Sequence, residues 1–138
     1  MRRFCIAVLF ATACGGSSDS GSTEPLVTEG GTFLLASVNG VLPYVVSDVS
    51  GNKHSISTGA IILDAVRHEF VETLTDVYEN ATQTSVGTTT LSGSYTRDGA
   101  SLTLRLAATQ GGGTIPAQVG DGKITSKEGD RTLVFVRR

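Results

Sequence analysis

Turn residues recur at short, regular intervals from Gly31 onward and separate runs that are rich in β-branched, aromatic and leucine residues. The clearest case is Asp98-Gly99, which follows an alternating run at 91–97 and precedes a second run at 101–108. Asp-Gly supplies the positive φ angles that a tight β-hairpin needs, and Asn39-Gly40 marks another tight turn in the same way. This punctuation predicts a series of short antiparallel strands, and therefore an all-β domain.

The runs give eight or nine expected strands. We place them at residues 31–39, 42–49, 54–63, 68–79, 91–97, 101–108, 115–119, 123–126 and 131–137. Sequential strands with mostly short links close most simply as a single small up-and-down antiparallel barrel, which leaves no exposed sheet edge. A two-sheet sandwich is the main alternative.

The expected strand at 54–63 contains a glycine, a residue that usually marks an irregular point in a strand. Ile56, Ala60 and Ile62 are expected to share one face of this strand. Gly59 lies among them and fits a β-bulge or a point where another backbone approaches closely.

Two further segments are less regular. The apolar spacing of 68–79 fits either a helix or a strand, and its density of Val and Thr favours a strand. Residues 81–90 are polar and rich in threonine, so we expect a long connection or the frayed start of the next strand.

The beginning of the chain resembles a bacterial lipoprotein signal. Arg2 and Arg3 precede an apolar run, 4–13, that is too short to cross a bilayer, since a spanning helix needs about 20 residues. Residues 11–14, Ala-Thr-Ala-Cys, are similar to a lipobox. The resemblance implies cleavage before Cys14 and lipidation of that cysteine, because several acyl chains together anchor stably. The alternative is an ordinary secretory peptide that leaves Cys14 as a free thiol.

These features predict three parts of the chain: a signal peptide at 1–13, a lipidated cysteine with a flexible Gly/Ser tether at 14–30, and a β-barrel domain at 31–138. Cleavage removes Cys5 and leaves Cys14 as the only cysteine, so no disulfide can form within the processed chain. The expected location is the bacterial cell envelope. Gly15 after the cysteine favours the outer membrane, with the domain facing the periplasm.

The charge of the chain argues against a nucleic-acid partner. The whole chain has 11 basic and 13 acidic residues, and loss of Arg2 and Arg3 leaves 9 against 13, a net charge near −4. The basic residues are scattered, whereas nucleic-acid binding needs a concentrated basic surface.

The only histidines, His54 and His68, give no catalytic motif. Neither accompanies a recognisable nucleophile, as a hydrolytic triad requires. His68 lies beside Glu69 and near Asp64, but adjacent strand residues point to opposite faces, and zinc needs three or four convergent ligands. A solvated turn is therefore the favoured interpretation, and we expect neither a metal nor a cofactor.

An acidic run on the fourth expected strand is the other candidate for chemistry. It consists of Glu69, Glu72, Asp76 and Glu79, of which Glu72 and Asp76 would share a face. Paired carboxylates can serve glycoside hydrolysis or bind calcium, but no calcium-loop motif is present, and a solvated face is favoured. The glycines at 111–113 lack the Lys-Ser or Lys-Thr of a phosphate loop. We expect no catalytic residue and no enzymatic activity.

Four short stretches resemble known proteins: Gly-Thr-Phe-Leu-Leu at 31–35, Ser-Val-Asn-Gly at 37–40 followed by Leu42-Pro43, Gly-Ser-Tyr-Thr at 93–96, and Val-Phe-Val-Arg at 134–137. Together they are similar to small uncharacterised bacterial lipoproteins with a lipocalin-like β-barrel. The resemblance implies a barrel and leaves its ligand open.

Eight strands enclose an interior just wide enough for side chains or for one small ligand. Six aromatic residues are expected to fill the core: Phe33, Tyr44, Phe70, Tyr78, Tyr95 and Phe135.

From the N-terminal signal and the expected barrel together, we expect a lipid-anchored envelope protein whose barrel binds a small apolar molecule or another envelope protein. A hollow barrel with an apolar mouth would favour the small molecule, and a filled barrel with an exposed apolar patch would favour the protein partner.

Overall fold

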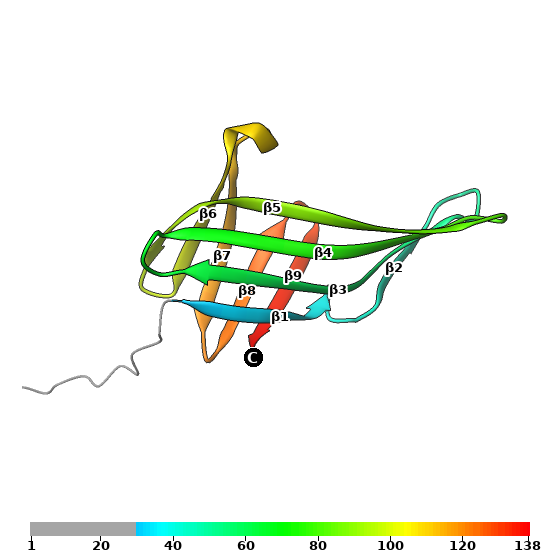
Figure 1. Cartoon of the computed structure of the whole chain (residues 1–138). Helices are drawn as coiled ribbons and strands as arrows, with labels where there is room; N and C mark the ends of the chain where they lie inside the picture. The colour runs from blue at the N-terminus through cyan, green and yellow to red at the C-terminus, as the bar shows by residue number, and fades with distance from the viewer. Residues whose placement is uncertain (1–29) are drawn as a thin grey trace, which may run out of the picture.

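The computed structural model describes residues 30–138, which form one nine-stranded antiparallel sheet and a single short 3-10 helix (Figure 1). The elements are β1 (Gly31–Val38), β2 (Tyr44–Ser47), β3 (Lys53–Asp64), β4 (Glu69–Glu79), β5 (Thr84–Asp98), β6 (Ser101–Leu106), η1 (Ala108–Gln110), β7 (Thr114–Gly120), β8 (Lys123–Glu128) and β9 (Arg131–Arg137).

The sheet closes on itself through β1. This strand pairs with β9 on one side, with Phe33 opposite Arg137, and with β3 on the other side, with Gly31 opposite Leu63. Eight strands therefore form a closed up-and-down barrel, and β2 is an extra strand on β3. The barrel prediction is confirmed, and the sandwich alternative is wrong because β1 joins both ends of the sheet.

The tight turns occur where the sequence predicted them. Asn39 and Gly40 have φ angles of 50° and 86°, and the backbone groups of Val38 and Val41 bond to each other across the turn. Gly99 has a φ of 57° between β5 and β6. Glycine and asparagine tolerate this left-handed region better than other residues, which explains their place at the corners.

The ambiguous segment 68–79 is a strand, as expected, and the segment after it is a strand as well. β5 begins at Thr84, and its first residues pair in register with β4, with Thr84 opposite Glu79 and Thr90 opposite Thr73. Of the two alternatives for 81–90, the start of the next strand is confirmed from Thr84 onward, and the long connection is wrong for that part. Threonine is a good strand former, and these residues are polar because they are exposed.

A β-bulge changes the expected face of β3. The register with β4 shifts between Ile56 and Thr58. The residues after the shift therefore point to the face opposite to the one that strict alternation from Ile56 predicts. Ile56 and Ile61 are buried, whereas Ile62 is 47% exposed. The prediction that Ile56, Ala60 and Ile62 share a face is wrong for this reason.

Gly59 is a point of close approach, as predicted. A Cβ at this position would lie 2.7 Å from the Thr73 carbonyl oxygen and 2.7 Å from a methyl group of Leu74. Only glycine allows β3 and β4 to pack this closely here.

The core is one cluster on the inner face of the barrel. It comprises Phe33, Leu35, Val38, Ile56, Ile61, Leu63, Phe70, Leu74, Tyr95, Leu102, Leu104, Ile115, Ala117, Val119, Ile124, Leu133 and Phe135. Four of the six expected aromatic residues belong to it. Tyr44 packs only partly against the cluster, and Tyr78 is 40% exposed, so these two do not fill the core.

Beyond the barrel, β2 to β5 continue as an open sheet, visible at the right of Figure 1. The first half of β3 pairs with β2 instead of β1, and β6 pairs with β5 only from Gly93 onward. We call this four-stranded part the extension. It overhangs one end of the barrel and supplies one wall of the site described below.

Between residues 30 and 138, no helix combines the length and the apolar character needed to cross a membrane. Cys14, the expected signal peptide at 1–13 and nearly all of the expected tether at 14–30 lie outside the described residues.

Candidate functional site

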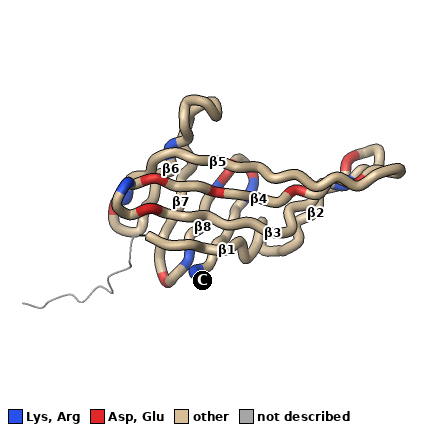
Figure 2. Tube along the Cα trace, in the orientation of Figure 1, with Lys and Arg blue, Asp and Glu red and all other residues tan. Residues whose placement is uncertain are grey.

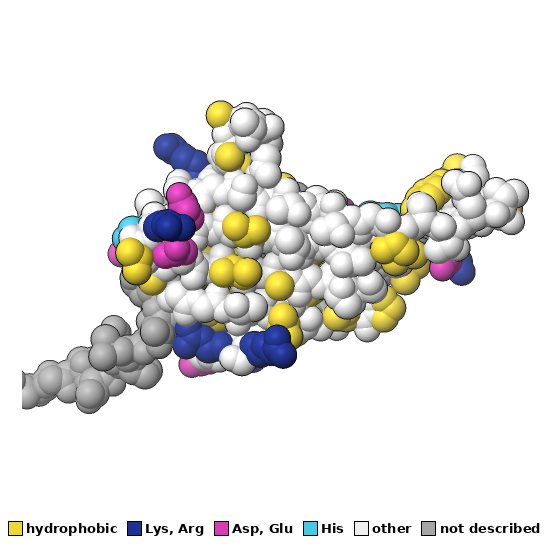
Figure 3. Space-filling view, in the orientation of Figure 1, with side chains coloured by type: hydrophobic (Ala, Val, Ile, Leu, Met, Phe, Trp, Pro, Cys, Tyr) yellow, Lys and Arg dark blue, Asp and Glu magenta, His cyan; other side chains and the backbone are white. Residues whose placement is uncertain are grey.

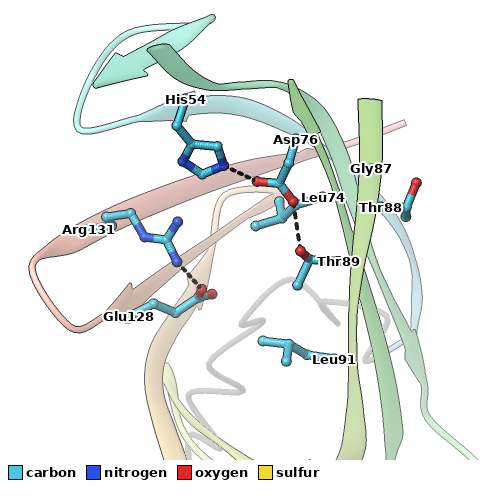
Figure 4. Close-up of a pocket in the computed structure, with 9 residues that line it drawn as sticks. All are labelled: His54, Leu74, Asp76, Gly87, Thr88, Thr89, Leu91, Glu128 and Arg131. Atoms are coloured by element: carbon cyan, nitrogen blue, oxygen red, sulfur yellow. Dashed lines mark hydrogen bonds and ion pairs between the residues drawn. The ribbon is translucent and has the colours of Figure 1, made fainter. Parts of the chain in front are cut away.

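A pocket of about 530 Å³ lies where the extension meets the barrel mouth (Figure 4). One wall comes from β3, β4 and β5, and the other comes from the β8–β9 hairpin. The lining side chains are His54, Leu74, Asp76, Thr89 and Leu91 from the first wall and Glu128 and Arg131 from the second; the chain at 87–88 passes beside them.

Strand alternation explains why these side chains meet. On β4, Leu74 and Asp76 follow Phe70 along the face that is buried in the barrel, and Leu74 pairs with Thr89 of β5. On β8 and β9, Glu128 and Arg131 continue the inner faces that begin at Ile124 and Phe135 and form the last pair before the turn. Successive side chains of a strand point to opposite faces, so both walls turn these residues inward.

Asp76 is the centre of a polar group on the first wall. Its Oδ1 lies 3.0 Å from Nε2 of His54, and its Oδ2 accepts a hydrogen bond of 2.7 Å from the Thr89 hydroxyl (Figure 4). In a hydrolytic triad the histidine stands between the acid and the nucleophile. Here the acid stands in the middle, so this trio positions side chains but does not activate the threonine as a nucleophile.

The second wall carries an ion pair. Nη2 of Arg131 lies 3.7 Å from Oε2 of Glu128, and the buried Ser126 hydroxyl donates to Oε1 of the same carboxylate at 3.4 Å. The Glu128 side chain is nearly buried, whereas that of Arg131 is partly exposed.

Glu72 lies inside the barrel, which corrects the sequence interpretation of the acidic run. It is 1% exposed, and neither of its carboxyl oxygens has a hydrogen-bond partner. Burial raises the pKa of Glu72 to about 8; the nearby negative charge of Glu128 adds to the shift, and the positive charge of Arg131 opposes it. Glu69 and Glu79 are exposed, as a solvated face requires, but Glu72 and Asp76 are turned inward.

The other predicted acid and histidine belong to a turn. Oδ1 of Asp64 accepts the backbone N–H groups of Val66 and Arg67 at 2.9 Å and 3.0 Å, and these bonds lower the pKa of Asp64. His68 adopts a φ of 54° and packs edge-on against Tyr95, with 5.7 Å between ring centroids. The structure does not bring His68 and His54 together.

The chain between residues 30 and 138 contains no group of three or more metal-ligating side chains placed to hold a metal ion. The three glycines at 111–113 all have positive φ angles and form the turn after η1.

Sequence reasoning missed Ser126, Glu128 and Arg131 as site residues. The expected strands end at 126 and begin again at 131, so Glu128 lay between two strands and Arg131 was one of the scattered basic residues. The available signal was the alternation along each strand, since Ile124, Ser126 and Glu128 lie on one face. That signal places the residues inward only if the strands are known to continue to the very edge of the turn.

Figure 2 shows Lys and Arg interspersed with Asp and Glu along the described chain. The fold and the pocket together define a class: a closed eight-stranded β-barrel with a mouth pocket of mixed apolar and polar character. Comparison of the chain with models of protein families, with curated proteins and with solved structures finds no match.

Proposed function

We propose that the chain is a lipid-anchored protein of the bacterial cell envelope whose barrel binds a small molecule at its mouth. The core cluster occupies the inner face of the barrel, so the proposal rests on the pocket at the mouth and not on a hollow interior. The pocket's volume lies within the range of roughly 300–1,000 Å³ that is typical of small-molecule sites, and mouths of β-barrels are frequent places for such sites. Leu74 and Leu91 offer an apolar surface, and the polar groups around them can fix a ligand's orientation.

We infer binding rather than catalysis from the order of contacts in the pocket. His54 and Thr89 both bond to Asp76, and the described contacts do not join them to each other. Nucleophilic catalysis would need a base in contact with a nucleophile. The pocket instead offers fixed donors and acceptors around an apolar floor.

The pocket can be tested with a neutral apolar fluorophore, N-phenyl-1-naphthylamine. We expect saturable binding with a rise in fluorescence, and we expect Gly87→Trp to abolish it, because a side chain at Gly87 has open space before it and borders the pocket. Thr90→Trp is the matched control, since Thr90 lies on the same strand, is exposed and does not line the pocket. Equal binding by both variants would rule out the pocket as the site.

Anchoring rests on the sequence around Cys14. We expect Cys14→Ser to release the protein from the membrane fraction and to stop incorporation of labelled palmitate. Cys5→Ser is the control, because Cys5 precedes the proposed cleavage site and takes no lipid. Membrane retention of the Cys14→Ser protein would refute the lipid anchor.

A second candidate function is contact with another envelope protein. Apolar side chains are exposed on the extension (Figure 3). Val45 is 50% exposed and Val86 is 69% exposed. Exposed apolar patches mark interaction surfaces. If this contact is the function, replacing Val45 and Val86 with lysine should remove chemical cross-links to envelope proteins in cells, whereas Gly87→Trp should leave them unchanged.

A further inference from the structure

Glu72 is a buried carboxyl group that the barrel does not need for its own hydrogen bonding. It is 1% exposed, and both of its oxygens lack partners within the described chain. A buried polar group without a partner costs on the order of 1–3 kcal/mol and calls for an explanation. An apolar residue of similar size would avoid this cost.

Its position relates Glu72 to the pocket. Leu74 lies two residues further along the same inward face of β4, and Leu91 pairs directly with Glu72 on β5. Both leucines line the pocket, and so does Glu128, whose charge acts on Glu72. The carboxyl of Glu72 therefore lies beneath the pocket floor, facing Glu128 across the barrel.

The charges of the pocket are unbalanced in favour of acids. Asp76 and Glu128 are acidic, and Glu72 lies behind them. Nη2 of Arg131 lies 3.7 Å from Oε2 of Glu128, and its charge also acts on Glu72, while His54 bonds to Asp76. An anionic ligand would meet repulsion here, whereas a cation would compensate carboxyl groups that have been removed from water.

On the basis of the pocket function proposed above, we propose that the pocket binds a small organic amine, with its ammonium group between the carboxylates of Glu72 and Glu128 and its apolar part along Leu74 and Leu91. An ammonium group has three N–H donors. Glu72 offers two buried oxygens without a hydrogen-bond partner, and Glu128 offers Oε2 beside the Oε1 that accepts from the Ser126 hydroxyl. A metal ion fits less well, because this part of the described chain offers no set of three metal-ligating side chains.

Binding of an ammonium group beside Glu72 also changes the number of protons that the protein holds. In the empty pocket Glu72 holds a proton at neutral pH, since its pKa is raised to about 8. The entering ammonium group keeps its own protons and takes the place of the proton on Glu72, which passes to solvent. Binding therefore releases one proton below pH 8, and the affinity for the amine rises about tenfold per pH unit from pH 6 until it levels off near pH 8.

The test uses the full chain and three probes of equal length and different charge: hexylamine, hexan-1-ol and hexanoate. Isothermal titration calorimetry at several pH values measures their affinities. We expect hexylamine to bind at least about tenfold (about 1.4 kcal/mol) more tightly than hexan-1-ol, because its ammonium group forms charge-assisted hydrogen bonds that a hydroxyl group lacks. Hexanoate should bind most weakly, because the carboxylates of the pocket repel it. Buffers of different ionisation enthalpy report the released proton directly.

Glu72→Gln should reduce the affinity for hexylamine to that for hexan-1-ol and remove the pH dependence. Glu128→Gln should weaken hexylamine as well, which provides a second variant. Glu69→Gln is the matched control, because Glu69 lies on the same strand but is exposed and points outward.

Two further results separate the inference from the proposed function. If hexan-1-ol binds as tightly as hexylamine and Glu72→Gln changes neither, the amine inference is overturned while the pocket function stands. If none of the three probes and no N-phenyl-1-naphthylamine binds, both are overturned.

Discussion

A carboxyl group inside a β-barrel gives up its hydration, and at Glu72 no hydrogen bond replaces the lost water. The folded protein therefore holds the proton of Glu72 up to about pH 8, whereas the unfolded chain releases it near the ordinary value of 4.5. Between these two pH values the folded state binds more protons than the unfolded state. The contribution of Glu72 to the free energy of unfolding thus falls as the pH rises through this window.

We predict that Glu72→Gln removes this loss. The free energy of unfolding of the variant should match that of the wild type near pH 4.5 and exceed it increasingly up to pH 8, by up to roughly 4 kcal/mol. Urea denaturation at pH 5, 6.5 and 8 measures the difference. Glu69→Gln is the control, because Glu69 lies on the exposed face of the same strand, and parallel curves for Glu72→Gln and the wild type would contradict the buried, protonated carboxyl.

Two glycines of β5 give a matched pair at the same scale. A Cβ on Gly93 would lie 1.9 Å from the Arg105 carbonyl oxygen, whereas a Cβ on Gly87 would meet nothing within 4 Å. We predict that Gly93→Ala lowers the free energy of unfolding by about 2–3 kcal/mol, because β5 and β6 must separate. Gly87→Ala should leave it unchanged or raise it by up to about 1 kcal/mol. Equal effects in urea denaturation would show that β6 does not approach β5 as closely as described.

Among the strands, β3 illustrates what a sequence pattern can and cannot locate. The expected strand at 54–63 agrees with β3 within one residue at each end. Its inward face was predicted wrongly after Ile56, because period two holds only in an uninterrupted strand. The bulge between Ile56 and Thr58 is a property of the pairing with β4; Gly59 was compatible with a bulge, but it does not give the position of the register shift.

The candidate site was hidden for a related reason. The sequence showed that Glu72 and Asp76 share a face, but a charged face is usually solvated, and the buried Phe70 and Leu74 on that same face were outweighed. Glu128 and Arg131 come from strands about fifty residues away along the chain. Only closure of the barrel brings them opposite Asp76. The alternation of residues along one strand does not predict how distant strands are aligned when the barrel closes.

The extension and the barrel should differ in local stability. The residues 84–90 of β5 are all exposed and have only β4 as a neighbour, whereas Tyr95 on the same strand is buried and paired with β6. Few buried contacts make local opening easy. We predict that the hydrogen-bonded amides of 84–90 exchange with a free energy of opening several kcal/mol lower than that of the amides around Tyr95.

Hydrogen exchange followed by NMR measures this difference residue by residue. The amides around Leu104 in β6 serve as the reference for global unfolding, since Leu104 is fully buried. Uniform protection along the whole of β5 would show that the extension and the barrel open as one unit.

At the scale of the whole molecule, the two ends of the described chain lie together. The Arg138 backbone N–H donates to the Thr32 carbonyl at 3.2 Å, the Arg137 side chain donates to the Gly30 carbonyl, and its guanidinium carbon lies 5.3 Å from the centre of the Phe33 ring. β1 thus closes the sheet between β9 and β3, although it is the first strand of the described chain. Closure of the barrel depends on its contacts with β9 and β3, not on the order in which the chain runs.

This arrangement predicts that the order of the chain can be changed without changing the fold. A circular permutant of 30–138, with the ends joined by a short Gly-Ser linker and new ends within 111–113, should form the same barrel, because those glycines lie in a turn and a Cβ there would meet nothing. A permutant opened between Thr103 and Leu104 should fail to fold, since that break cuts a strand paired on both sides. Circular dichroism and N-phenyl-1-naphthylamine binding report the two outcomes. If the first permutant folded but lost the fluorophore, closure through β1 would stand and the mouth pocket would depend on the β6–β7 turn, a dependence that its lining residues do not predict.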